Sequence, residues 1–157
     1  MNHADVSQLF GAQANAYARF RPHYPKHLFA WLAAQCPEHQ LALDIACGNG
    51  QASEPLREHF KRVLACDASF EQLQACVDKP GLQRFVAEAQ AQPLPDHSLD
   101  LIVVAQALHW FATPAFFTEV RRLLKPGGLF CAWCYSLMRI DTELDALIDH
   151  LYWHTLG

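Results

Sequence analysis

The sequence predicts an α/β fold, a doubly wound parallel sheet with helices on both of its faces. From residue 41 onward, short apolar runs alternate with segments of helical periodicity, and this alternation is typical of parallel strands joined by right-handed crossovers. In addition, the long apolar run LDLIVVAQAL (99–108) indicates a central strand that is covered on both faces.

Length and composition narrow the class of protein. The chain has 157 residues, which favours one domain, and its net charge of −4 argues against a broad surface for nucleic-acid phosphates. It contains no apolar run of about 18 residues, so we expect no membrane span. Its first 25 residues hold no continuous apolar core of the signal-peptide type, and we therefore expect a cytoplasmic location.

The first 40 residues are expected to form a lid appended to a domain at 41–157. Aromatic and polar side chains are interleaved up to residue 24, where prolines stop any helix. A short helix is predicted at 25–36, because Pro25 suits a first helical turn and apolar side chains recur on one face.

The remaining elements follow in order. Strands are predicted at 41–46, 62–67, 81–87, 99–108 and 129–135. Helices are predicted at 52–60, 69–77, 113–124 and 141–154. Ser69 and Thr113 are suitable N-caps, and the sequence KPGG ends the helix before it.

The last predicted helix differs from the earlier ones. It carries one apolar stripe, formed by Leu144, Leu147, Ile148 and Leu151. No strand follows it before the sequence stops. We therefore expect that the chain is C-terminally truncated or that a further strand comes from elsewhere.

The candidate binding loop follows the first strand, in the segment LALDIACGNGQAS (41–53). Gly48 and Gly50 let the backbone approach a ligand without an intervening side chain, and doubly wound sheets bind ligands beyond the carboxyl ends of their strands. The dinucleotide pattern G-x-G-x-x-G requires a third glycine, but Ser53 stands at that position. This departure weakens the prediction of a dinucleotide cofactor.

Two acids near this loop help to distinguish between cofactors. Asp67 ends the second strand, where a carboxylate can accept hydrogen bonds from both ribose hydroxyls of either kind of cofactor. Asp44 lies inside the first strand, and a buried acid there needs a partner. The ammonium group of S-adenosylmethionine would supply one, directly or through water. The alternative is that Asp44 binds the amides of its own loop.

Four segments resemble the successive motifs of class I S-adenosylmethionine-dependent methyltransferases. In chain order they are LDIACGNG (43–50), VLACDAS (63–69), VAEAQAQPLPDHSLDLIVVAQALHWF (86–111) and LLKPGGLF (123–130). The chain is similar to the broad type-11 group of this class. YARFRPHYP (17–25) together with LHWF (108–111) is closer to the trans-aconitate methyltransferase-like branch. Ala46 departs from the family pattern, which often has a glycine there.

The resemblance implies S-adenosyl-L-methionine as the cofactor and assigns residues to it. The methionine moiety would lie against residues at the end of the first strand, namely Asp44, Ala46, Gly48 and Gly50. Asp67 would bind the ribose diol, with Ala68 against the adenine. Glu88 and Ala89 would meet the adenine edge, and Gln106 would close the floor near the sulfur.

The resemblance also implies a strand order. The family has a Rossmann-like sheet of seven strands in the order 3-2-1-4-5-7-6, and this sequence supplies five, expected in the order 3-2-1-4-5. Without the last two family strands, the fifth strand would be an exposed edge.

Residues on either side of these motifs are further candidates. Tyr17, Arg21 and Tyr24 could fold over the cofactor, because arginine pairs with carboxylates and aromatic faces attract a sulfonium; otherwise they belong to a helix packed on the sheet edge. His109 follows the fourth strand and is the candidate catalytic residue, as a base or as a donor that orients the acceptor. The alternative is that His109 caps the next helix.

Together, these features predict a methyltransferase for a small-molecule acceptor, such as a carboxylic acid or a quinone or lipid precursor. The motifs of nucleic-acid methylation are missing from the sequence, and neither the Cys131–Cys134 spacing nor the His150–His154 spacing predicts a metal site. The alternatives are a truncated, non-catalytic remnant that binds a partner, and an NAD(P)-dependent oxidoreductase. The sequence makes no prediction of oligomeric state.

Overall fold

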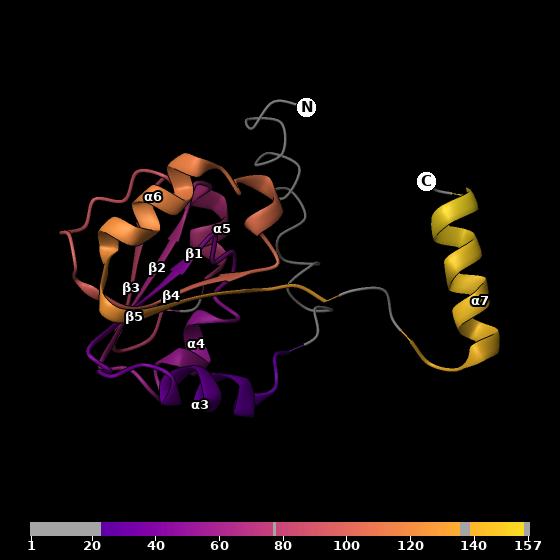
Figure 1. Cartoon of the computed structure of the whole chain (residues 1–157), viewed down its shortest axis with the longest axis horizontal. Helices are drawn as coiled ribbons and strands as arrows, with labels where there is room; N and C mark the ends of the chain where they lie inside the picture. Colours follow the sequence, from indigo (N-terminus) through magenta and orange to yellow (C-terminus); the bar gives the residue numbers. More distant parts are fainter. Residues whose placement is uncertain (1–22, 77, 136–138, 156–157) are drawn as a thin grey trace.

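The computed structural model describes residues 23–76, 78–135 and 139–155. Tyr17 and Arg21 lie outside these ranges. In the described part, five parallel strands form a sheet in the order β3-β2-β1-β4-β5 (Figure 1). This arrangement confirms the predicted fold class and strand order.

The strands are β1 (Leu41–Ile45), β2 (Arg62–Asp67), β3 (Leu82–Val86), β4 (Leu99–Ala105) and β5 (Leu124–Trp133). The helices are α3 (Lys26–Ala34), α4 (Ser53–Leu56), α5 (Phe70–Ala75), α6 (Pro114–Leu123) and α7 (Thr142–His150). Two short helical turns complete the described elements, η1 (Leu108–Trp110) and η2 (Leu151–Thr155).

Helices cover both faces of the sheet. On one face, Phe29 and Leu32 of α3 and Leu56 of α4 pack against Val63 and Val103 of the sheet. On the other face, α6 lies over β1 and β4 (Figure 1). Its side chains Phe116 and Leu123 are fully buried there. Helix α3, which belongs to the segment predicted as a lid, therefore contributes to the core.

The predicted helix caps are confirmed. Thr113 Oγ1 accepts a hydrogen bond from the N–H of Phe116 at 3.3 Å, and Pro114 occupies the first turn of α6. Ser69 Oγ accepts from the N–H of Gln72 at 3.2 Å. These bonds satisfy N–H groups that the first helical turn would otherwise leave without a partner.

Two elements, α4 and β5, differ most from their predicted bounds. The helix predicted at 52–60 ends at Leu56, because the next N–H groups bond to the carbonyl three residues back and form tighter turns. The fifth strand begins at Leu124 rather than at residue 129. Its register shifts within the KPGG sequence, where Gly127 has φ +80°.

The chain after β5 leaves apolar surface exposed. Leu144, Leu147 and Leu151 are 42%, 63% and 52% exposed, and Figure 1 shows α7 standing apart from the sheet. In the described residues β5 pairs only with β4, so it forms the predicted exposed edge.

Asp100 joins the amino ends of three segments. Its Oδ2 accepts hydrogen bonds from the N–H groups of Gln40 and Leu41, both at 2.7 Å. Its Oδ1 accepts from Lys125 Nζ at 2.6 Å, and Lys125 also pairs with Glu38. These charge-assisted bonds lower the pKa of Asp100 although burial opposes them, so the carboxylate form is favoured.

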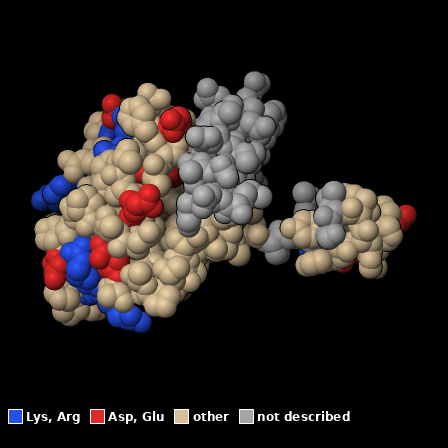
Figure 2. Space-filling view, turned by 90° about the horizontal axis from the view of Figure 1, so that it is seen from above, with Lys and Arg blue, Asp and Glu red and all other residues tan. Residues whose placement is uncertain are grey.

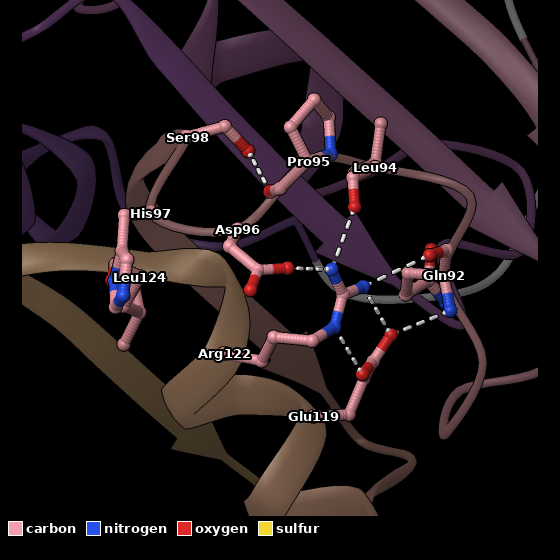
Figure 3. Close-up of polar contacts among 9 residues, drawn as sticks. All are labelled: Gln92, Leu94, Pro95, Asp96, His97, Ser98, Glu119, Arg122 and Leu124. Carbon is pink, nitrogen blue, oxygen red and sulfur yellow. Dashed lines mark hydrogen bonds and ion pairs between the residues drawn. The ribbon is translucent and has the colours of Figure 1, made fainter.

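The connection between β3 and β4 is a loop rather than a helix. The guanidinium of Arg122 holds this loop in position. Arg122 of α6 donates to Asp96 Oδ1 at 2.6 Å and to the carbonyls of Leu94 and Gln92 at 2.8 and 3.1 Å (Figure 3). It also donates twice to Glu119, which accepts in turn from the N–H of Gln92. The loop therefore depends on α6 for its position.

Replacing Arg122 with alanine is expected to lower the free energy of unfolding by about 1–2 kcal/mol, because two loop carbonyls and two carboxylates lose their donor. Urea denaturation of the variant and the parent chain measures the difference. Arg121→Ala is the matched control, since this adjacent side chain is exposed. Equal stability of the two variants would contradict the role given to Arg122.

Candidate functional site

The structure brings the described candidate residues to the carboxyl edge of the sheet. They lie at strand ends or shortly after them: Asp44, Ala46, Gly48 and Gly50 at β1, Asp67 and Ala68 at β2, Glu88 and Ala89 at β3, and Gln106 and His109 at β4. Tyr24 reaches the same edge, because its ring lies 5.4 Å from that of Trp133 at the end of β5.

The turn after β1 depends on left-handed backbone. Ala46, Gly48 and Gly50 have φ angles of +56°, +53° and +85°. A Cβ on Gly50 would lie 2.5 Å from the sulfur of Cys76, so only glycine fits there. Ala46 carries a Cβ in a conformation that costs an L-residue about 1–2 kcal/mol. The alanine that stands here in place of the family's frequent glycine therefore strains the backbone.

Asp44 is fully buried beneath this turn. Ser53 Oγ donates to its Oδ2 at 2.5 Å, whereas its Oδ1 has no hydrogen-bond partner among the described residues. Burial raises the pKa of Asp44 to about 7, and the charge of Asp67 adds to that rise, while hydrogen bonds from Ser53 oppose it. Ser53 stands where the dinucleotide pattern has its third glycine. Its hydroxyl is the group that donates a hydrogen bond to the buried Asp44.

Asp67 connects the turns that follow β1 and β2. Its Oδ2 accepts from the N–H of Gly48 and its Oδ1 from the N–H of Ser69, both at 2.9 Å. Burial raises the pKa of Asp67, and these backbone hydrogen bonds, with one from Ala68, lower it. The two carboxylate oxygens still have lone pairs for further donors.

The ends of β4 and β5 carry two buried polar groups, which belong to Gln106 and Trp133. Gln106 adopts φ +64° and its N–H donates to the carbonyl of Trp133 at 2.8 Å. The Nε2 of Gln106 and the Nε1 of Trp133 are buried and lack a hydrogen-bond partner among the described residues. Tyr24 lies edge-on to Trp133, and its ring stacks with Tyr135 at a centroid distance of 6.1 Å.

Sequence reasoning treated Trp133 as part of an apolar strand and did not select it. The available signal was its position, because a large side chain with one N–H lies near the carboxyl end of the strand predicted at 129–135. That Trp133 Nε1 is buried and has no hydrogen-bond partner among the described residues could not be read from the sequence.

His109 lies in η1, exposed, with its ring 4.7 Å from that of Trp110. The alternative role of His109 as a helix cap is wrong, because Thr113 caps α6. Ala68 and Glu88 are exposed as well, whereas Ala89 is buried.

Chemistry that depends on disulfides or on a bound metal ion has little support among the described residues. All six cysteines are free thiols, and the described part of the chain holds no cluster of three metal-ligating side chains. None of the helices at 23–76, 78–135 and 139–155 is long and apolar enough to cross a membrane. Figure 2 shows basic side chains interspersed with acidic ones on the face in view.

The fold and the glycine turn at its carboxyl edge define a Rossmann-like domain of class I methyltransferases. Residues 43–132 match the methyltransferase domain family Methyltransf_11, and the chain belongs to this family. A solved structure, of a candidate type II methyltransferase from Anaeromyxobacter dehalogenans, is similar with a TM-score of 0.80 and 44% identity. The match covers 87% of this chain and 58% of that one.

Two relatives are similar in sequence. A protein of Dictyostelium discoideum that is named as a methyltransferase is 37% identical over 151 residues, which cover 94% of this chain and 57% of the relative. An uncharacterised methyltransferase of Mycobacterium tuberculosis is 35% identical over 125 residues, covering 79% and 51%. The chain thus spans little more than half the length of these relatives.

Ala46→Gly is expected to stabilise the protein by about 0.5–1 kcal/mol, because relief of left-handed strain exceeds the greater freedom of glycine in the unfolded chain. Thermal or urea unfolding checks this. Ala107→Gly is the matched control: Ala107 is also half-buried but has φ −127°, so glycine should destabilise there. Destabilisation by both changes would refute the strain at Ala46.

The buried Asp44 predicts a pH dependence of stability. Its pKa is about 7 in the folded chain and about 3.9 when unfolded, so between these values the folded state retains a proton that the unfolded state releases. The Asp44 contribution therefore becomes less favourable as pH rises from about 4 to about 7. The stability of Asp44→Asn relative to the parent should increase over that window.

Urea denaturation of the cofactor-free protein at several pH values measures this difference. Asp78→Asn is the control, because the Asp78 side chain is 85% exposed. A difference between Asp44→Asn and the parent that stays constant across the window would show that Asp44 does not titrate there.

Proposed function

We propose that the whole protein transfers a methyl group from S-adenosylmethionine to a small-molecule acceptor. The observation that carries this proposal is the buried Asp44 beneath a glycine turn in a member of the methyltransferase domain family. One oxygen of Asp44 has no partner in the part of the chain that the structure describes. A buried carboxylate requires a compensating group. The ammonium of the methionine moiety would supply it, directly or through water.

The other residues of the carboxyl edge fit the same cofactor. Asp67 retains lone pairs for two ribose hydroxyls after accepting from Gly48 and Ser69. Gly48 has no side chain that could obstruct a ligand at this turn, whereas a Cβ on Gly50 would point toward the buried Cys76. The remaining contacts would come from Ala46 and Gln106 toward the methionine and sulfur, and from Ala68, Glu88 and Ala89 toward the adenine.

When bound, the cofactor supplies a methyl group on a sulfonium, which an acceptor displaces in line. The protein then has to align the acceptor and exclude water, and alignment of this kind can supply several kcal/mol. His109, exposed after β4, would orient the acceptor or take its proton. A carboxylate acceptor needs no base, so for such an acceptor His109 acts only in orientation.

A carboxylic acid is the acceptor class that we favour. Gln106 Nε2 and Trp133 Nε1 are buried donors without partners among the described residues, and a carboxylate oxygen is a strong acceptor for such groups. Tyr24, with Tyr17 and Arg21 outside the described residues, would close over the site from the N-terminal segment. The resemblance of this segment to the trans-aconitate methyltransferase-like branch supports the same class.

Asp67→Asn is expected to weaken binding of S-adenosylhomocysteine more than tenfold, because the ribose hydroxyls lose their charged acceptor. Isothermal calorimetry on the folded chain measures the affinity. His109→Ala is the comparison variant, and its affinity should stay close to that of the parent. No binding by the folded parent would refute the cofactor assignment, and an unchanged affinity of Asp67→Asn would refute the ribose contact.

A further inference from the structure

A groove with a volume of about 770 Å³ opens over β2 and β3, on the face of the sheet that carries α6. Leu64 and Phe85, which belong to the core cluster of this face, line it together with Leu41. The connection between β3 and β4 crosses the same face as a loop, which covers less of a sheet than a helix about 10 Å wide. The groove is therefore a consequence of a crossover that contains no helix.

The outer wall of the groove is formed by three apolar residues of this loop, Pro93, Leu94 and Pro95. Arg122 donates to the carbonyl of Leu94 at 2.8 Å (Figure 3). Ser98 Oγ donates to the carbonyl of Pro95 at 2.7 Å. Each proline ring also restricts its own backbone. A ligand therefore meets a wall that is already ordered, which lowers the entropic cost of binding.

One cation at the groove has no acidic partner among the described residues. Arg62, the first residue of β2, lines the groove and donates to Gln83 Oε1 at 2.9 Å. Arg84 also lines the groove, but it pairs with Asp78 and donates to two carbonyls at the C-terminal end of α5. A guanidinium has five N–H donors, so Arg62 can still bind a carboxylate through two hydrogen bonds.

We propose that this groove binds a carboxylic acid with an apolar body, and that Arg62 holds its carboxylate. Small-molecule pockets of about 300–1,000 Å³ are typically apolar, with a few polar groups that fix the orientation of the ligand. The apolar body would lie between Phe85 and the proline wall. The available guanidinium matches a single negative charge. Gln83, whose Oε1 accepts from Arg62, retains amide N–H donors for the carboxylate as well.

The cation of this groove lies away from the carboxyl edge where the methyl cofactor is proposed to bind. Arg62 begins β2 and Asp67 ends it, and five residues of strand span about 16 Å. Arg62 pairs with Leu41, the first residue of β1, at the amino edge of the sheet. Binding of the acid at the groove therefore does not require the proposed function, and this acid is a second ligand rather than the methyl acceptor.

Two-dimensional NMR of the nitrogen-15-labelled chain tests the site without any cofactor, with decanoate as the probe below its critical micelle concentration. Saturable shifts are expected at residues 62–64, 83–86 and 94–98. Arg62→Met, which keeps an apolar stem, should weaken decanoate binding at least about fivefold, because the carboxylate loses its charged donor. The affinity for decan-1-ol should stay within about twofold, since the alcohol carries no charge.

Two further variants serve as controls. Arg121→Met, at an exposed arginine of α6, should leave the binding of both probes unchanged. Gln83→Trp places an indole in the groove from an exposed position of β3, so it should weaken both decanoate and decan-1-ol. No saturable binding, or equal decanoate affinity of the parent and Arg62→Met, would overturn the proposal.

Other occupants give different results. Shifts confined to Gln106 and Trp133 would place the acid at the proposed acceptor site and overturn binding at the groove. Groove shifts that depend on protein concentration without decanoate would show that a second copy of the chain covers the groove, which also overturns it. Decanoate bound at the groove of a chain that binds no S-adenosylhomocysteine upholds this site and instead refutes the proposed function.

Discussion

The hydrogen bonds from Gly48 and Ser69 to the carboxylate of Asp67 are the constraint on which the rest of the carboxyl edge depends. The parallel pairing of β1 with β2, in which Ile45 lies opposite Cys66, brings the two following turns together. Asp67 then fixes one turn against the other through backbone N–H groups. This arrangement holds three alternate left-handed positions in place, residues 46, 48 and 50, although one of them is an alanine.

The two acids of the site are neighbours with different surroundings. Asp67 is partly exposed, and three backbone donors favour its charged form against the effect of burial on its pKa. Asp44 is fully enclosed and is held through Ser53 alone among the described residues. The unequal supply of donors makes Asp44 the group whose charge depends most on what binds beside it. This difference in hydrogen-bond donors connects the packing of the turn with the cofactor binding that is proposed for it.

The strand order could be predicted from the resemblance to class I methyltransferases. The burial of β4 and the caps at Ser69 and Thr113 could be predicted from local sequence patterns. The partner of Ser53 and the absence of a partner for Trp133 among the described residues could not be predicted. Each of these depends on which side chains two separate segments bring into contact. The strand register within KPGG was missed for a similar reason, since pairing with β4 determines where β5 begins.

The bonds made by Asp100 also bear on how the chain acquires its structure. The carboxylate and the N–H of Gln40 are sixty residues apart in sequence, and Lys125 and Glu38 are separated by eighty-seven. Contacts of such span form late, because a long loop must close before they give any stabilisation. During synthesis, β1 and the turn that follows it leave the ribosome well before β4 exists. Until β4 arrives, β1 has only β2 to pair with, and its other edge is open to incorrect partners.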